Sequence, residues 1–282
     1  MHVTRLATYP LKSASGVLAD RATVTPIGLE HDRRWVALDP DGHRVSAREC
    51  HALLGVTATP TPEGLLLGDR SGASVRVATP GPDATEVPVR ISRLERLTLA
   101  ADEASAWLSR TTGRELRLAH LGDIRAREIG ESHGGRPGET MSLADAGPIL
   151  LVTEASVDRL RDLVAQESGE AWLGREEALE RFRPSIVVDG EESFVEDSWR
   201  RVRIGGTTYR FGEHCDRCVL TTIDPTSLET GKEPIRTLAR HRAWDGATWF
   251  GIRLIPELAA GATAEVAVGD EVEVLETAAH PV

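Results

Sequence analysis

Residues 34–45 read RWVALDPDGHRV, and this stretch predicts a β-hairpin. An apolar run leads into Asp39-Pro40-Asp41-Gly42, and a second short run follows this turn. The proline presets the φ angle of the turn, and the glycine accepts a positive φ angle. The stretch therefore assigns the N-terminal part of the chain to the β class.

Further short runs of apolar and β-branched residues lie on both sides of this hairpin. Turn residues separate them at roughly regular spacing, which is typical of a barrel or a sandwich. The strands that we expect cover residues 2–9, 22–25, 54–56, 65–67, 75–77 and 87–91.

The hydrophobic pattern changes after residue 100. Residues 102–108 have helical spacing and predict a helix that ends near Gly113. Residues 129–147 are rich in Gly, Ser, Asp and Glu and show little apolar periodicity. We therefore expect a connector or a lid in this stretch.

The second half of the chain mixes strands with a few helices. Residues 150–165 predict a buried strand and then a helix, with Thr153 as the N-cap residue. This half lacks the regular strand–helix alternation of a doubly wound parallel sheet, so we predict a β-rich α+β fold. The other expected elements are helices at 176–182 and 233–241, strands at 186–188, 249–255 and 266–275, and a hairpin at 202–211.

The composition is that of an acidic globular protein. Of the 282 residues, 40% are hydrophobic and 27% are charged. No stretch approaches about 18 uncharged apolar residues, and the N-terminus has no secretory pattern, so we expect no membrane helix and no export. The formal net charge of −11 argues against nucleic acid and anionic membrane surfaces as partners.

The chain has three cysteines, Cys50, Cys215 and Cys218. An odd and sparse set does not build a disulfide framework. We therefore expect a reducing, cytoplasmic location, where a cysteine is more often catalytic or a metal ligand.

The densest functional signal is residues 214–225, which read HCDRCVLTTIDP. The segment begins where a strand is expected to end, so we place both cysteines in a loop. A thiolate binds soft metals or attacks electrophiles, and His214 and Arg217 would favour the thiolate form. Chemistry alone leaves four interpretations open. They are a zinc site, which lacks enough ligands here, a Cys215–Cys218 redox disulfide, a single thiolate ligand or nucleophile, and two buried structural cysteines.

This segment resembles the Cys-x-x-Cys-x-x-Thr-Thr-x-Asp-Pro motif of MOSC-domain proteins, a family that includes the amidoxime-reducing components. Six further segments resemble family motifs and occur in the expected order across nearly the whole chain. They begin at Tyr9 (YPLKS), Asp32 (DRRW), Val152 (VTEAS), Phe182 (FRPSI), Glu196 (EDSW) and Phe250 (FG).

The resemblance implies a molybdenum cofactor, Mo-molybdopterin, with the second cysteine of the pair as its protein ligand. Metal binding and catalysis are thereby assigned to Cys218. A pterin with a terminal phosphate requires cations and hydrogen-bond donors, and arginine suits phosphate recognition. The resemblance gives no reason to expect pyridoxal phosphate as a real cofactor. The positions implied to hold the pterin are Lys12, Ser13, Arg33 and Arg183, with Thr153, Ser156, Ser185 and Thr221 as neutral donors.

The implied architecture is an N-terminal β-barrel-like domain, residues 1–120, followed by a MOSC β-barrel domain with covering helices, residues 121–282. The cofactor would lie in the cleft between them. The implied activity is reduction of N-hydroxylated compounds, such as amidoximes, hydroxylamines and N-hydroxylated bases. The alternative is a cofactor carrier or sulfur-transfer protein that has no reductase turnover.

Reduction requires electrons, and no further cysteine cluster follows the last expected strand. We therefore expect a separate donor of the ferredoxin or flavin-reductase type instead of a fused iron–sulfur domain. Three departures from the family pattern affect the edge of the substrate pocket more than the metal site. They are the four residues between Pro225 and Thr230, Ser185 where the family often has Asn, and His214 before the cysteine pair.

Overall fold

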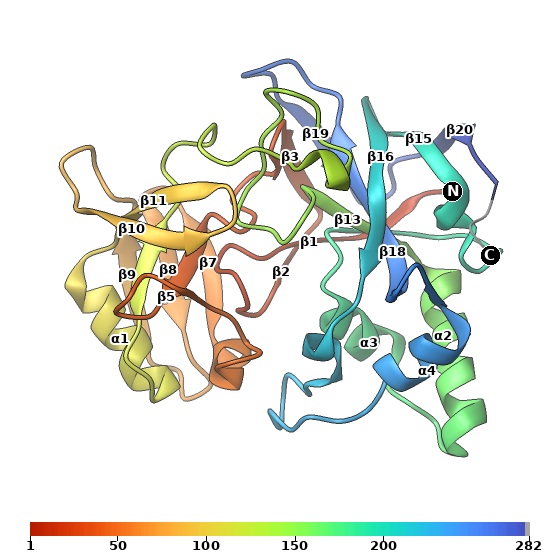
Figure 1. The fold of residues 1–282 in the computed structure, drawn as a ribbon, viewed down its shortest axis with the longest axis horizontal. Coiled ribbons are helices and arrows are strands. Elements are labelled where there is room, and N and C mark those ends of the chain that lie inside the picture. Colours follow the sequence, from red (N-terminus) through yellow and green to blue (C-terminus); the bar gives the residue numbers. More distant parts are fainter. Residues whose placement is uncertain (280–282) are drawn as a thin grey trace.

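The computed structural model describes residues 1–279 and has the β-rich α+β fold that the sequence predicts. Two parts lie side by side in Figure 1. One part, drawn in orange to yellow, contains most of residues 34–120, and the other contains the N-terminus and the largest sheet.

The first part is built from two antiparallel sheets and one helix. Helix α1 (Asp102–Thr112) ends at Gly113, which has φ +69°, as the sequence predicts. The five-stranded sheet has the order β10 (Glu86–Ile91), β11 (Leu94–Leu99), β12 (Arg117–His120), β5 (Trp35–Leu38) and β6 (Arg44–Val45). The three-stranded sheet has the order β7 (Thr57–Thr61), β8 (Gly64–Gly68) and β9 (Ser74–Ala78).

The predicted hairpin at residues 34–45 is present. Strands β5 and β6 pair antiparallel, with Ala37 opposite Val45. Gly42 has φ +82°, and a β-carbon there would lie 2.5 Å from the carbonyl oxygen of Pro88. Both the backbone angle and the close approach of the neighbouring strand therefore require glycine at this turn.

The second part is organised around a nine-stranded sheet. Its strands run in the order β2 (Val17–Ala19), β1 (Val3–Thr8), β14 (Ile186–Val188), β13 (Ile149–Thr153), β18 (Ala247–Pro256), β16 (Thr207–Asp216), β15 (Trp199–Ile204) and β20 (Val272–Thr277), with β17 (Ala243–Trp244) on β18. A smaller sheet has the order β19 (Ala264–Ala267), β3 (Arg21–Thr25) and β4 (Gly28–Leu29).

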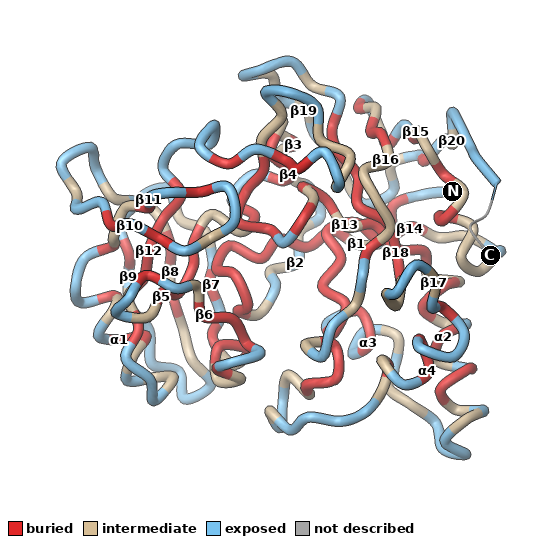
Figure 2. The backbone as a smooth tube through the Cα atoms, in the orientation of Figure 1, coloured by how far each residue is buried: buried red, intermediate tan, exposed pale blue. Residues whose placement is uncertain are grey.

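Three helices lie beside the large sheet: α2 (Glu154–Ser168), α3 (Arg175–Phe182) and α4 (Ile235–His241). Thr153 caps α2 as predicted, since its hydroxyl accepts a hydrogen bond from the backbone N–H of Ser156 at 3.1 Å. The apolar faces of the helices form one buried cluster with Val152, Val187 and Phe250 of the sheet. The buried backbone in Figure 2 follows the strands and these helix faces.

The strand pairing crosses the predicted domain boundary at residue 120. Strand β1 pairs with β14, and β3 pairs with β19 near the other end of the chain. The first 29 residues thus add strands to sheets of the second part, and the division at residue 120 stays a prediction.

Three local predictions are wrong. Residues 54–56 are not a strand, because His51–Gly55 forms the 3-10 helix η1. The backbone N–H of Val56 donates to the carbonyl of Leu53, three residues earlier, as in a 3-10 helix. A short apolar run cannot distinguish such a turn from a strand. Residues 266–275 are two strands, because Gly269 (φ +92°) makes a turn between β19 and β20.

The third error concerns the cysteine segment. Strand β16 continues through Asp216, because its pairing with β18 persists to Asp216 opposite Trp249. His214 and Cys215 therefore lie in a strand, and Cys218 lies in the following loop, directly before the 3-10 helix η4 (Val219–Thr222). The other 3-10 helices are η2 (Glu131–His133) and η3 (Val195–Ser198).

No helix within residues 1–279 has the length and apolar character that crossing a membrane requires.

Strand β18 is the central support of the large sheet, so its core contacts should dominate stability. Leu254 lies in β18, is 1% exposed and belongs to the largest core cluster of the second part. Replacing Leu254 with Ala should lower the free energy of unfolding by about 2–5 kcal/mol, because the deletion leaves a cavity. Denaturant unfolding measures this change. Leu18→Ala is the control, because Leu18 is 60% exposed, and an equal loss in both variants would contradict the prediction.

Candidate functional site

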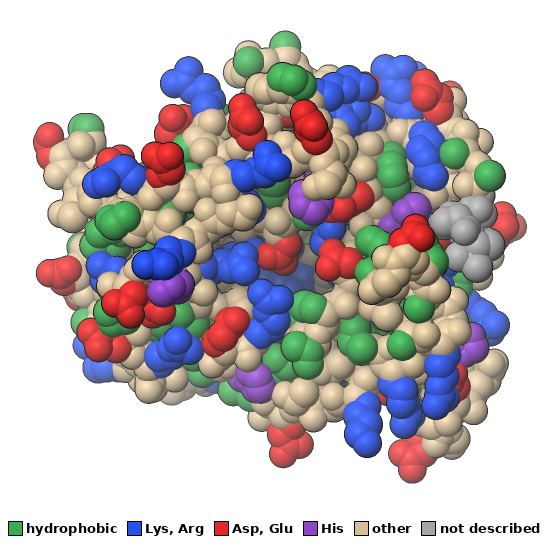
Figure 3. Space-filling view, viewed as in Figure 1, with side chains coloured by type: hydrophobic (Ala, Val, Ile, Leu, Met, Phe, Trp, Pro, Cys, Tyr) green, Lys and Arg blue, Asp and Glu red, His purple; other side chains and the backbone are tan. Residues whose placement is uncertain are grey.

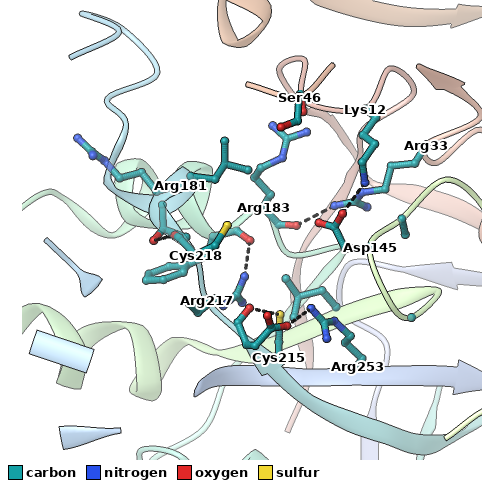
Figure 4. Close-up of a pocket in the computed structure, with 18 of the residues that line it drawn as sticks. Lys12, Arg33, Ser46, Asp145, Arg181, Arg183, Cys215, Arg217, Cys218 and Arg253 are labelled. Carbon is teal, nitrogen blue, oxygen red and sulfur yellow. Dashed lines mark hydrogen bonds and ion pairs between the residues drawn. The ribbon is translucent and has the colours of Figure 1, made fainter. Parts of the chain in front are cut away.

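A pocket opens between the two parts, in the middle of the face shown in Figure 3. It is a concave site lined by side chains from both parts of the molecule, which is typical of a ligand site. Its walls come from the turn after β1, the segment after β6, the loop before β13, the end of α3, and the segment joining β16 to η4. Figure 4 shows its main side chains.

One wall is positioned by backbone hydrogen bonds between two distant segments. The N–H of Arg33 donates to the carbonyl of Tyr9 at 2.9 Å, and the N–H of Trp35 donates to that of Pro10 at 3.0 Å. The N–H of Lys12 donates back to Trp35 at 2.8 Å. These bonds join residues 9–13 to residues 32–35. Lys12, Ser13 and Arg33 are thereby placed on the same wall, as Figure 4 shows for the first and last.

Two arginines of the pocket lie on one aromatic ring. The guanidinium carbons of Arg33 and Arg183 are 4.6 and 4.2 Å from the centroid of the Tyr9 ring. The buried carboxylate of Asp32 pairs with Arg33 and accepts a hydrogen bond from the backbone N–H of Tyr9 at 2.7 Å. Burial lowers the pKa of Arg183 to about 10, still well above neutrality. Both guanidinium groups therefore remain charged in the cell.

Lys12 is the second kind of cation in the wall. Its ammonium group donates to the carbonyl of Leu143 at 2.8 Å and to the carboxylate of Asp145 at 2.7 Å. Burial lowers the pKa of Lys12 to about 8, although Asp145 opposes this shift. Conversely, Lys12 holds the pKa of Asp145 well below its usual range. Lys12 is thus charged below about pH 8 and neutral above it.

Cys218 presents an exposed thiol to the same pocket. The residue precedes η4, and its carbonyl accepts hydrogen bonds from the N–H and hydroxyl of Thr221, at 3.2 and 3.0 Å. Cys215 differs, because it is buried and its sulfur contacts the carbonyl of Asp216 at 3.6 Å. Only the second cysteine of the pair is therefore accessible as a ligand or nucleophile.

Two more arginines surround the cysteine pair. Arg217 donates to the carbonyls of Phe250 and Phe182, at 2.9 and 3.1 Å. Burial lowers the pKa of Arg217, and Cys215 opposes this shift. Arg253 donates to Asp216 at 2.7 Å and also pairs with Glu213, and its pKa is raised by nearby negative groups. The cysteine pair therefore lies among cationic side chains.

The pocket is strongly cationic although the chain is acidic. Seven Lys and Arg side chains line it, against the carboxylates of Asp145 and Asp216. Arg183 and Arg217 each keep one buried guanidinium nitrogen without a hydrogen-bond partner among the described residues. Buried cationic donors of this kind require an acceptor. A bound anionic group supplies one, so the donor set fits a phosphate-bearing cofactor.

Six of the predicted site residues meet in this pocket: Lys12, Ser13, Arg33, Arg183, Cys218 and Thr221. The structure places the other three elsewhere. Thr153 and Ser156 donate to the buried carboxylate of Glu196, at 3.1 and 2.7 Å, at the start of α2. Ser185 is buried beside the pocket wall, and its backbone bonds to Leu150 and Ala7.

The motif comparison misses several polar residues of the pocket. Arg253 gave a signal that could have been used, because it stands alone in the apolar run GIRLIP of β18. Asp145 gave no signal, since its partner Lys12 is 133 positions away. The missed residues are Ser46, Arg48, Asp145, Arg181, Asp216 and Arg253.

Comparison with known proteins agrees with this picture. Residues 1–115 match the family model of the MOSC N-terminal beta barrel domain, and residues 138–273 match that of the MOSC domain. Mitochondrial amidoxime-reducing component 1 of Danio rerio is 30% identical over 253 residues, covering 86% of this chain and 75% of that protein. The Homo sapiens protein of the same name is 31% identical over 255 residues, covering 86% of this chain and 72% of that protein.

A second type of relative matches a smaller share of its own length. Molybdenum cofactor sulfurase of Danio rerio is 27% identical over 272 residues, which covers 93% of this chain and 32% of that protein.

The pKa of Lys12 is directly testable, because the chain contains only two lysines, Lys12 and Lys232. NMR titration with isotope-labelled lysine should show one side chain titrating near pH 8. Lys12→Arg assigns the signal by removing it. Asp145→Asn should lower the pKa of Lys12 further, because the carboxylate that raises it is lost. Titration of Lys12 near 10.5 would refute its buried placement.

Proposed function

Because this chain belongs to the MOSC-domain family and carries that family's N-terminal β-barrel domain, we propose that it is a molybdenum-cofactor enzyme that reduces N-hydroxylated compounds. The observation that carries the proposal is the pocket itself. It joins one exposed thiol, Cys218, to a wall of cations with unpaired buried donors.

Cys218 is the proposed metal ligand. A soft thiolate suits such a centre, and one protein ligand would suffice because the cofactor would bring further ligands of its own. Arg217 lies next to it in the sequence and lines the same pocket. Thr221 fixes the backbone of Cys218 through its two hydrogen bonds, so the main-chain position of the ligand is set before the cofactor binds.

The phosphate and pterin are assigned to the cationic wall. Lys12, Arg33 and Arg183 supply charge, and Ser13 supplies a neutral donor from the same turn. Arginine offers two parallel donors to phosphate oxygens, which fixes orientation as well as affinity. Because Asp32 and the Tyr9 ring already hold Arg33, little side-chain ordering remains for the binding step.

When bound, the cofactor supplies a redox-active centre that removes oxygen from an N–O bond with two electrons and two protons, releasing water. The protein contributes binding, orientation and electrostatics around that chemistry. The substrates are amidoximes, hydroxylamines and N-hydroxylated bases, and the electrons come from a separate donor of ferredoxin or flavin-reductase type. We also propose a cytoplasmic location, because the sparse cysteines fit a reducing compartment. The amidoxime-reducing relatives are named as mitochondrial proteins.

The second candidate is a cofactor carrier or sulfur-transfer protein without reductase turnover. The similarity to molybdenum cofactor sulfurase favours it, although this chain spans only 32% of that protein. Both candidates use Lys12, Arg33 and Cys218. Reduction of benzamidoxime with an artificial electron donor separates them, because a carrier retains the cofactor and reduces nothing.

The metal assignment is tested by Cys218→Ala in a host that makes the cofactor. We expect the wild type to hold stoichiometric molybdenum and the variant to lose both the metal and benzamidoxime reduction, because the protein thiolate is gone. Elemental analysis for molybdenum and zinc, together with the reduction assay, measures this. Cys50→Ala is the matched control, since Cys50 lies in the core of the first part. Full molybdenum and activity in Cys218→Ala would overturn the assignment, and zinc in the wild type would replace it with a zinc site.

The cationic wall is tested by Arg183→Met. The methionine side chain is also long and unbranched, but it carries no charge. Cofactor occupancy should fall by roughly tenfold or more, because a buried charge-assisted contact to phosphate is lost. Fluorescence of the released pterin measures occupancy without any turnover. The control is Arg96→Met, which removes a half-exposed arginine far from the pocket. Unchanged occupancy in Arg183→Met would remove Arg183 from the binding wall.

A further inference from the structure

Most cations of the pocket already have an acidic partner in the protein. Lys12 pairs with Asp145, Arg33 with Asp32, Arg181 with Asp224, and Arg253 with Glu213 and Asp216. Within residues 1–279, no carboxylate lies within 4 Å of the remaining three, which are Arg48, Arg183 and Arg217. These three are the pocket cations that form no ion pair within the described residues.

The three arginines without an ion pair occupy different places. Arg183 and Arg217 belong to the second part of the molecule, lie close to Cys218, and face the proposed cofactor. Arg48 comes from the first part, in the segment after β6, and its side chain is exposed. Arg48 is therefore a pocket-lining cation that is open to solvent, so a ligand that enters the pocket can meet it.

The arrangement around Arg48 holds its guanidinium without an ion pair. Its backbone N–H and its Nε atom both donate to the hydroxyl oxygen of Ser46 at 3.3 Å. Ser46 is buried and is fixed in turn by Glu49, whose carboxylate accepts from its N–H at 2.8 Å and its hydroxyl at 2.5 Å. The Glu49 carboxylate is thus directed to Ser46, and the two terminal nitrogens of Arg48 keep no hydrogen-bond partner among the described residues.

We propose that Arg48 is a specificity-determining residue that selects N-hydroxylated substrates carrying an oxyanion group, such as a carboxylate. This inference rests on the proposed reductase function and names the substrate class of the same pocket. The two terminal nitrogens of arginine match the two oxygens of a carboxylate. Because its guanidinium forms no ion pair, Arg48 should attract anionic compounds and repel cationic ones.

The test uses two substrates that differ only in charge, benzamidoxime and 4-carboxybenzamidoxime, with cofactor-loaded protein. The wild type should prefer the carboxylated compound in kcat/KM by roughly tenfold. Arg48→Gln should bring this ratio close to one, while Arg48→Lys should keep part of the preference. Arg96→Gln is the matched control, because it removes an arginine that does not line the pocket, and it should keep the wild-type ratio.

A binding measurement keeps this inference separate from the reductase function. Calorimetry compares benzamidine with 4-carboxybenzamidine, which resemble the reaction products and need no turnover to bind. Tighter binding of the carboxylated compound that disappears in Arg48→Gln supports the anion subsite, even if no N-hydroxylated compound is reduced and the reductase function fails. Equal ratios in the wild type and Arg48→Gln, in both kinetics and binding, overturn the inference whatever the activity.

Discussion

Repulsion between like charges is the constraint on which this pocket depends. Seven cationic side chains meet in one place, and each must be held there before a ligand arrives. Buried carboxylates hold some of them, as Asp32 holds Arg33. Others are held by dipoles and π-electrons, since Arg217 donates to two carbonyls and Arg183 lies against the Tyr9 ring. Contacts with carbonyl groups and an aromatic ring hold a guanidinium without an acidic partner, so the pocket keeps an excess of positive charge. This excess would attract an anionic ligand.

One continuous segment of the chain connects the two parts of the molecule at the pocket. Strand β1 belongs to the large sheet, and the turn after it carries Lys12 and Ser13 across to the first part. Backbone hydrogen bonds to residues 32–35 then fix that turn. Because one continuous segment is anchored at both ends, the distance between Lys12 and the Cys218 side of the pocket is set by main-chain geometry. A pocket formed by two independent domains would leave that distance to a flexible hinge.

The sequence predicts those features that are local. The hairpin at residues 34–45, the C-terminal glycine of α1 and the Thr153 cap all follow from residues within a few positions of each other. The sequence fails where the outcome depends on distant partners. Strand β16 reaches Cys215 only because β18 pairs with it there, and Asp145 enters the site only because Lys12 reaches it. Six of the nine site residues expected from the family motifs line the pocket. The other three do not, because a motif gives the position of a residue in the sequence and not its contacts in the fold.

Thr153 and Ser156 show what a motif can and cannot specify. Both hydroxyls are donors of the kind that a pterin requires, and a one-dimensional pattern cannot distinguish a ligand contact from a structural one. In the fold they donate to Glu196, whose pKa is raised by burial and by the neighbouring Asp197. A buried carboxyl group without such donors would destabilise the core. The two hydroxyls thus stabilise the start of α2. Two of the sequence motifs, one with Thr153 and Ser156 and one with Glu196, contact each other in the fold.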